Sequence, residues 1–432
     1  MSIISPSYAV RMLVTESGER FPLLIETKTG LPDFDTTVFT VSIPRAKNRA
    51  SATIEQSLRA IMVFMLFCER DSIHIKERMK EGRLFDLAEI DNLSAFCRLS
   101  LTEIHNQVKY NKEKKSDNIR ILSSEKVRMG SQRNKTKINE IKQDGIGIRL
   151  IYIKEYISWL VAKKILKLKH DNAIRTALES SLATIVGIIS AKIAEKKGQN
   201  DNSRLGLDKR ALSHFNGIID PAIIDKPWRT KHGRQRNTLM LQWFLRLGLR
   251  RGELAGIKIE DINFQENTVI IHRRADDPTD PRLYQPNAKT NARVLALDED
   301  LAQITREYVS GTRRNNKGAR KHGFLFVATG TGSPISLRSI NSIFEKLRER
   351  WPDVFDDLSP HVLRHTFNDE YSRLCDESKI SSEEEEKIRR ELNGWSLRSK
   401  QAARYTQRHI RRKSRIASLD LQKKIAKSQD QK

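Results

Sequence analysis

The strongest constraint on the fold of this chain is the spacing of its large apolar residues after Ala50. They recur at steps of three and four residues, which places them on one face of an α-helix: Ile54, Leu58, Ile61, Met62, Met65 and Leu66. Ser51 or Thr53 can cap this helix at its N-terminus. The pattern predicts a long amphipathic helix that buries one side.

The same period returns further along the chain. Residues 148–166 and 176–196 are each amphipathic, and we expect another helix over 93–105. The intervening segment 109–142 is densely basic and poor in large apolar residues, so it is expected to be mobile or ordered only on an anion. Residues 49–200 are therefore predicted to form a helical, basic, DNA-binding domain.

Residues 1–48 have a different composition, rich in β-branched residues and broken by Ser17-Gly18 and by a Gly-Leu-Pro-Asp turn. We predict a β-rich extension whose strands are Tyr8–Thr15, Phe21–Glu26 and Thr37–Ile43. Whether this extension touches DNA or has no role in binding is left open by the sequence.

A polar linker at 198–203 separates these residues from a second domain over 205–415, which is followed by a basic tail at 416–432. The fold class expected is mainly α with a small antiparallel sheet. The expected elements are helices Asp208–Phe215, Asn237–Leu247 (ending at Gly248), Leu301–Tyr308 and Ser336–Arg348, a basic loop Arg229–Arg236, and strands Thr268–His272, Arg293–Leu297 and Phe324–Val327. The tail is expected to be a basic amphipathic helix at most.

The charge balance indicates the class of partner. The 432 residues contain 79 Lys and Arg against 54 Asp and Glu, a formal net charge of +25 with a pI near 10. Such an excess favours a polyanion. The three cysteines, Cys68, Cys97 and Cys375, form no Cys-x-x-Cys pair, and no signal peptide or membrane span is expected. We expect a cytoplasmic, nucleoid-associated protein without cofactor or metal.

Three short motifs carry the chemistry. GLRRGELAGIK contains Arg250 and Glu253, HVLRHTF contains His361 and Arg364, and GW is followed ten residues after its tryptophan by the tyrosine of RYT. Guanidinium groups can each bind two oxygens of a phosphate, and a phenol can attack the phosphorus. Together these residue types suit the cleavage of a phosphodiester.

In this order the motifs resemble the arginine box, the His-x-x-Arg-His box and the Gly-His/Trp…Tyr box of the tyrosine recombinase (phage integrase) family, over about residues 205–415. The resemblance implies that Arg250 and Arg364 hold the scissile phosphate and that Tyr405 is the nucleophile. The product would be a 3′-phosphotyrosyl link with a free 5′-hydroxyl. Because that link conserves the phosphodiester energy, rejoining needs no ATP.

The resemblance also assigns the remaining polar groups. Lys289 would protonate the leaving 5′ oxygen, His361 would assist proton transfer near the tyrosine, and Trp395 would donate its indole N–H to the phosphate. Glu253 would orient an arginine, and His365 would hydrogen-bond structurally.

Some features depart from the family pattern. Trp395 replaces the commoner histidine, the spacing to Tyr405 is one residue long, and an insertion is expected around 379–387. Tyr371 and Tyr308 are rivals for the nucleophile. The acidic run at 383–386 is expected to be a solvated helix face.

The resemblance implies a site-specific recombinase that clamps double-stranded DNA between its two domains and integrates or excises a mobile element. Two recombining sites imply a homo-tetramer, whose tails could dock on neighbouring protomers, and accessory DNA-bending or directionality proteins. Two alternatives remain open. One is a type IB topoisomerase-like relaxing enzyme, and the other is a non-catalytic DNA-binding regulator that kept the fold.

Overall fold

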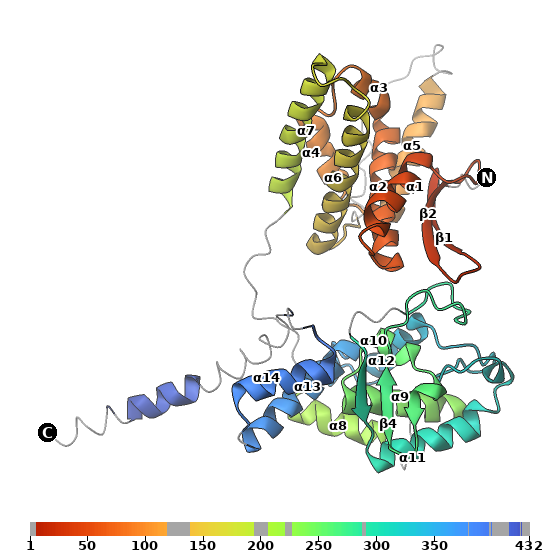
Figure 1. Cartoon of the computed structure of the whole chain (residues 1–432), viewed down its shortest axis with the longest axis vertical. Coiled ribbons are helices and arrows are strands. Elements are labelled where there is room, and N and C mark those ends of the chain that lie inside the picture. Colours follow the sequence, from red (N-terminus) through yellow and green to blue (C-terminus); the bar gives the residue numbers. More distant parts are fainter. Residues whose placement is uncertain are drawn as a thin grey trace, which may run out of the picture. The chain divides into compact units, whose positions relative to one another are not determined.

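The computed structural model describes residues 6–118, 139–193, 206–220, 227–286, 291–378, 380–396, 399, 414–423 and 425. The chain divides into two compact units, Met1–Gln199 and Asn200–Lys432 (Figure 1). Lys289, Tyr405 and the predicted linker at 198–203 lie outside the described residues, and so does most of the basic segment 109–142.

The N-terminal residues form an antiparallel hairpin of β1 (Tyr8–Val14) and β2 (Arg20–Glu26), which confirms the first two predicted strands. The third predicted strand, Thr37–Ile43, is wrong. That segment is α1 (Phe34–Thr40), followed by a π-helical turn at Val41–Arg45. The Asp33 carboxylate caps α1 by accepting from the Thr36 N–H at 2.8 Å, which favours helix over strand. Phe39 is then buried edge-on against Tyr156.

In the described part of the N-terminal unit, the helices that follow are α2 (Ser51–Asp71), α3 (Ile75–Lys80), α4 (Leu87–Phe96), α5 (Leu101–Asn118), α6 (Gln143–Ile165) and α7 (Ala173–Lys192). The predicted helices at 148–166 and 176–196 are confirmed as α6 and α7. The N-cap of α2 is Ala50, so neither Ser51 nor Thr53 caps it.

The single helix expected at 93–105 is wrong, because the chain breaks between α4 and α5. Arg149 on α6 donates to the carbonyl oxygens of Cys97 and Leu99, at 2.9 and 2.7 Å, and holds the break open. Ser100 also donates its backbone N–H to the Asn139 oxygen at 2.8 Å. Tertiary hydrogen bonds thus overrule the local helical pattern. Residues 109–118, expected to be mobile, continue α5 as helix.

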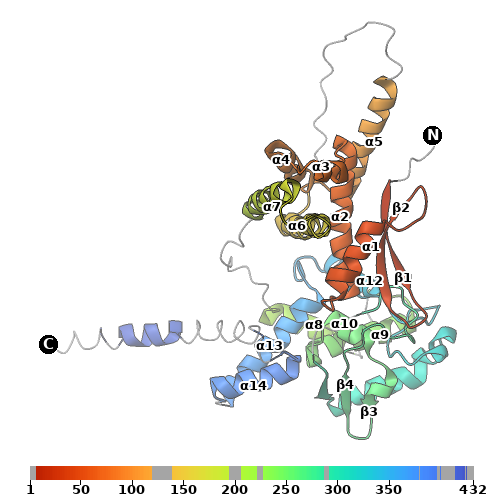
Figure 2. The same ribbon diagram turned by 45° about the horizontal axis from the view of Figure 1, so that its top comes forward.

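Two helices of this unit, α2 and α7, are long and apolar enough to cross a membrane by composition alone. Both contribute to one hydrophobic core with α6, through residues such as Ile61, Phe64, Ile157 and Ile185. In Figures 1 and 2, α2 lies between the β1–β2 hairpin on one side and α6 and α7 on the other. Packing within the unit buries 56% of the apolar stretch of α2 and 17% of that of α7, so burial accounts for the apolar character of α2 alone.

The C-terminal unit is helical around a three-stranded antiparallel sheet in the order β3-β4-β5. The predicted strands Thr268–His272 and Arg293–Leu297 are confirmed as β4 and β5, which pair with Val269 opposite Leu295. The elements are α8 (Lys209–Ile219), α9 (Lys231–Leu247), α10 (Arg251–Gly256), β3 (Ile262–Asn263), β4 (Thr268–Ile271), β5 (Arg293–Ala296), α11 (Glu299–Tyr308), α12 (Leu337–Arg350), α13 (Pro360–Glu377) and α14 (Ser382–Asn393). Residues 414–423 are helical and exposed.

Two predictions for this unit are wrong. The basic stretch 229–236 is largely the first turns of α9, because Thr230 caps the helix by accepting from the Gly233 N–H at 3.0 Å. The segment 324–327 forms only isolated bridges, Lys258 with Phe324 and Val327 with Pro334. Its apolar side chains enter the core, which explains the strand-like composition.

Buried His232 on α9 gives the unit a pH dependence. Its Nδ1 lies 2.9 Å from the Thr329 Oγ1, and its ring stacks on Tyr308. Burial, reinforced by the charge of Arg236, lowers the pKa of His232 to about 4. An unfolded histidine titrates near 6.5, so between about pH 6.5 and 4 the unfolded state binds more protons and stability falls as pH falls.

We therefore expect wild-type protein to lose stability between pH 7 and 5, by up to about 1.4 kcal/mol per pH unit for this one proton. Urea unfolding at both pH values measures the loss. The His232→Gln variant should show a loss smaller by about 1 to 2 kcal/mol. Equal losses in the two proteins would contradict this role of His232.

Candidate active site

Arg250 lies at the start of α10 as its N-cap residue, with extended backbone geometry. Its backbone N–H donates to Glu253 Oε2 at 3.0 Å, and its Nη1 donates to Glu253 Oε1 at 3.1 Å. The Arg250 side chain keeps 34% of its surface exposed. The buried Glu253 carboxylate thus fixes the Arg250 guanidinium, while part of the Arg250 side chain stays accessible to a ligand.

Arg364 lies on α13, which begins with Ser359 as its cap and Pro360 in its first turn. The residue is only 2% exposed. Its Nη1 donates to the Gly248 carbonyl oxygen at 2.5 Å and its Nη2 to that of Asn393 at 3.2 Å. Arg364 is therefore fixed by the ends of two helices, α9 and α14.

The arginine side chains of the site donate to carbonyl groups at the C-terminus of α14. The Asn393 carbonyl oxygen accepts from Arg364 and also from Arg250 Nη1 at 3.4 Å. Arg293 Nε donates to the Leu392 oxygen at 2.9 Å. The last carbonyls of a helix lack intrahelical partners and carry partial negative charge, so they bind cations well. Three arginines far apart in the sequence converge there.

Glu253 completes this arginine cluster. The carboxylate is buried and lies 2.9 Å from Arg293 Nη2, 3.1 Å from Arg250 Nη1 and 3.9 Å from Arg364 Nη1. Three guanidinium groups against one carboxylate leave a formal charge of +2 among these four side chains. An excess of fixed cations, one of them partly exposed, suits an anionic group such as a phosphate.

Two histidines lie on α13 beside Arg364. The Nε2 atoms of His361 and His365 are 3.0 Å apart, and their rings meet edge to face. Such a contact requires one imidazole to donate and the other to accept. His361 is exposed and His365 half-buried, so the pair can exchange a proton with a ligand.

Trp395 follows directly after the αL residue Gly394 that ends α14. It is 8% exposed, and its ring lies 5.6 Å from the Arg364 guanidinium carbon. The structure thus brings Arg250, Glu253, Arg364 and Trp395 together. Donation by the indole to a phosphate stays a prediction.

The rival tyrosines are poorly placed to attack DNA. Tyr308 is completely buried in the core, and burial raises its pKa to about 12. Tyr371 lies on α13 under the Arg389 guanidinium, 4.8 Å from ring centre to Cζ, and burial raises its pKa as well. A nucleophile needs an accessible oxygen and an easily lost proton, and Tyr308 has neither.

Sequence reasoning missed Arg293 and Asn393. Arg293 was expected only to open a strand. In β5 it points inward with Leu295, between outward-facing neighbours, so a charge at an inward position of the strand pattern could have revealed it. Asn393 acts through its backbone carbonyl, which no residue pattern encodes.

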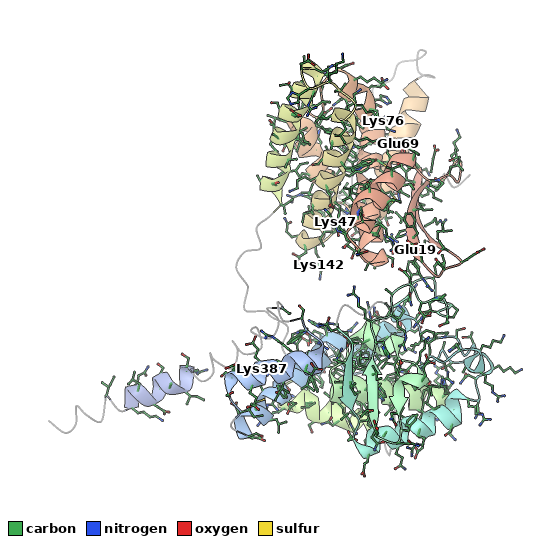
Figure 3. All side chains as sticks on the ribbon, in the orientation of Figure 1. Glu19, Lys47, Glu69, Lys76, Lys142 and Lys387 are labelled. Atoms are coloured by element: carbon green, nitrogen blue, oxygen red, sulfur yellow. The ribbon has the colours of Figure 1, made fainter. Side chains whose placement is uncertain are left out.

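The acidic run at 383–386 is only partly the solvated face that we expected. Glu383 is exposed and pairs at 2.8 Å with Lys387, which Figure 3 labels on α14. Glu385 instead is buried and pairs with Arg389, which is also buried. Glu385 is the buried carboxylate of the run because the side of α14 that carries it packs against α13.

Gly248 connects α9 to the arginine cluster and admits no side chain. Its φ is +59°, and a Cβ there would lie 2.4 Å from the Phe367 ring. We expect Gly248→Ala to destabilise the protein by at least about 1 to 3 kcal/mol in urea unfolding. The control is Gly217→Ala in α8, where a Cβ meets nothing within 4 Å. It should be neutral or stabilising by up to about 1 kcal/mol. Equal effects of the two substitutions would contradict this.

Comparison with known proteins finds similar sequences and structures. Residues 221–375 match the phage integrase family model, a range that contains Arg250, His361 and Arg364 and ends before Trp395 and Tyr405. The tyrosine recombinase XerC of Thermodesulfovibrio yellowstonii is 27% identical over 37% of this chain and 49% of its own length. The virulence plasmid integrase pGP8-D of Chlamydia muridarum is 28% identical over 45% of this chain and 52% of its own. The chain thus spans about half the length of these curated relatives.

Among solved structures, the XerH site-specific recombinase bound to a palindromic difH substrate aligns over 85% of this chain and 96% of its own, at 14% identity and a TM-score of 0.38. The Tn1549 transposon integrase in complex with transposon right end DNA aligns over 64% and 96%, at 15% identity and a TM-score of 0.33. The sequence matches show that residues 221–375 of this chain form a domain of the phage integrase, or tyrosine recombinase, family.

Proposed function

We propose that this protein is a site-specific DNA recombinase that cuts and rejoins duplex DNA through a 3′-phosphotyrosyl intermediate. The observation that carries the proposal is the convergence of Arg250 and Arg364 on the Asn393 carbonyl, with Glu253 behind them. Fixed cations that need no rearrangement stabilise the charge that develops on a phosphate during attack.

The residues then take the following roles. Arg250 and Arg364 hold the non-bridging oxygens, and Tyr405 attacks the phosphorus as its own proton is lost. His361, paired with His365, assists that proton transfer. Lys289 gives a proton to the departing 5′ oxygen. Reversal of these steps by a new 5′-hydroxyl rejoins the strand without ATP.

The partners proposed follow from the same reaction. The substrate is double-stranded DNA, bound by a chain with a net charge of +25. Two DNA sites taken through four strand cleavages call for a homo-tetramer, aided by accessory DNA-bending or directionality proteins. The curated relative named as a virulence plasmid integrase supports a role in integrating or excising a mobile element. We place the protein in the cytoplasm, at the nucleoid.

A suicide-substrate assay tests the proposal. The substrates are duplexes from the DNA that flanks the gene, nicked close to the candidate sites. They trap a covalent intermediate because the short fragment that carries the free 5′-hydroxyl diffuses away. Wild-type protein should give a slowly migrating adduct that protease removes. Tight, specific binding without adduct would instead indicate a regulator. Adduct formation with relaxation of supercoiled DNA, but without strand exchange, would indicate the topoisomerase-like alternative.

Binding to DNA of unrelated sequence should weaken steeply with salt. Each phosphate contact releases a counterion, so the slope of log K against log salt is about −0.9 per contact. With six or more contacts, affinity should fall by at least about 10³-fold between 50 and 200 mM salt. Fluorescence anisotropy with a labelled duplex measures this slope, and a flat response would exclude binding through the basic surface.

A further inference from the structure

A chain of buried polar side chains joins α13 to α14 behind the arginine cluster. Arg389 on α14 pairs with Glu385 one turn before it, and its Nη1 donates to the backbone oxygen and to the Oδ1 of Asn368 on α13, at 2.9 and 3.1 Å. Asn368 and Asn393 then exchange a reciprocal pair of amide hydrogen bonds at 3.2 and 3.1 Å. All four residues are at most 3% exposed. We name them the polar chain.

The polar chain ends on the residue that orients the arginines. The Asn393 side chain is held by Asn368 and by the Arg389 carbonyl oxygen, to which its Nδ2 donates at 2.9 Å. The Asn393 backbone oxygen accepts from Arg250 and Arg364. Asn393 thus connects the two groups of residues. Its side chain belongs to the polar chain, and its carbonyl oxygen accepts from both guanidinium groups. Figures 1 and 2 show α13 and α14 lying side by side.

Stability alone gives little reason for this arrangement. A buried ion pair is often matched or exceeded by well-packed apolar residues of similar volume, because desolvation offsets the attraction. Hydrogen bonds between amides and a guanidinium are directional, however, and they fix one register of α14 against α13. Apolar contacts would tolerate small sliding of the helix.

We propose that the polar chain is a positioning device for catalysis, in which Glu385, Arg389 and Asn368 place the Asn393 carbonyl so that Arg250 and Arg364 face the phosphate. The inference rests on the proposed function and extends it to residues that touch no substrate. A displacement of about 1 Å in a reacting geometry can cost about 10²-fold in rate. The polar chain prevents such a displacement at the end of α14.

The test removes the ion pair without leaving a lone buried charge. The double variant Glu385→Leu/Arg389→Met is compared with Glu386→Leu/Arg390→Met, which makes the same changes one residue along α14, where the pair is partly exposed. The first should form adduct about 10²-fold more slowly in single-turnover experiments, with the Kd for DNA and the Tm near wild type. The control should react at the wild-type rate. Arg389→Lys, which keeps the charge, should recover part of the loss.

The outcomes separate the two proposals. Absence of adduct with wild-type protein defeats the proposed function. The positioning claim is then decided by the side-chain Nε–Hε resonances of Arg250 and Arg364, which should shift in the first variant and stay in the control. If wild type reacts, an unchanged rate in the first variant overturns the inference. Should that variant fail to fold, Asn368→Leu decides by the same rate and resonance measurements.

Discussion

Replacing Tyr405 with phenylalanine is expected to abolish the covalent protein–DNA adduct, lowering its rate of formation by about 10⁴-fold or more. Phenylalanine lacks the oxygen that would bond to phosphorus, while its ring preserves the shape of the side chain. Binding of intact duplex should change little, because the arginines that we propose to hold the phosphate are unaltered. The measurement is adduct formation on nicked duplex, followed over time on a denaturing gel.

Tyr371→Phe is the matched control. This tyrosine lies on α13 two turns beyond Arg364, under the Arg389 guanidinium. Because burial raises the pKa of Tyr371, its hydroxyl is harder to ionise than an exposed phenol. The variant should keep the wild-type rate. If Tyr405→Phe still formed the adduct and Tyr371→Phe did not, the nucleophile would be Tyr371 on α13.

Arg364→Lys is expected to slow adduct formation by about 10² to 10³-fold, as for other lost donors to a developing oxyanion. The guanidinium donates to the Gly248 and Asn393 carbonyls, which fixes the orientation of the planar group. A lysine ammonium is a single point of charge and cannot occupy both positions. One buried carbonyl loses its partner, so the free energy of unfolding should fall by about 1 to 3 kcal/mol.

The neighbouring Arg251 provides the comparison. Its Nη1 donates to Asn341 on α12 at 2.6 Å, and it takes no part in the contacts with Glu253 given above. Arg251→Lys should keep adduct formation within about threefold of wild type, a difference of less than 0.7 kcal/mol in barrier. If Arg364→Lys behaved like Arg251→Lys, Arg364 would be a structural residue and the phosphate site would lie elsewhere.

Local patterns predicted the elements that local interactions decide. α6, α7, α8, α11 and α12 follow from apolar periodicity, and Ser336 caps α12. The errors arise where a local cap was not recognised, as at Asp33 and Thr230, or where a distant group intervenes. Arg149 breaks the helix expected at 93–105, and the packing of Phe39 against Tyr156 supports a helix where threonines and valine suggested a strand.

For the candidate site, the sequence by itself determined which chemical groups are available, because guanidinium, imidazole, indole and carboxylate are identified by residue type and their order along the chain is fixed. It could not determine what holds them. Arg250 meets the Asn393 oxygen across 143 positions of sequence, and every residue carries such a backbone oxygen. Only the packing of α14 against α13 selects that one carbonyl, and only burial distinguishes Glu385 from the acidic residues beside it. Hydrogen bonds to backbone groups depend on where a chain returns in space, so the tertiary structure alone decided how the arginines are oriented.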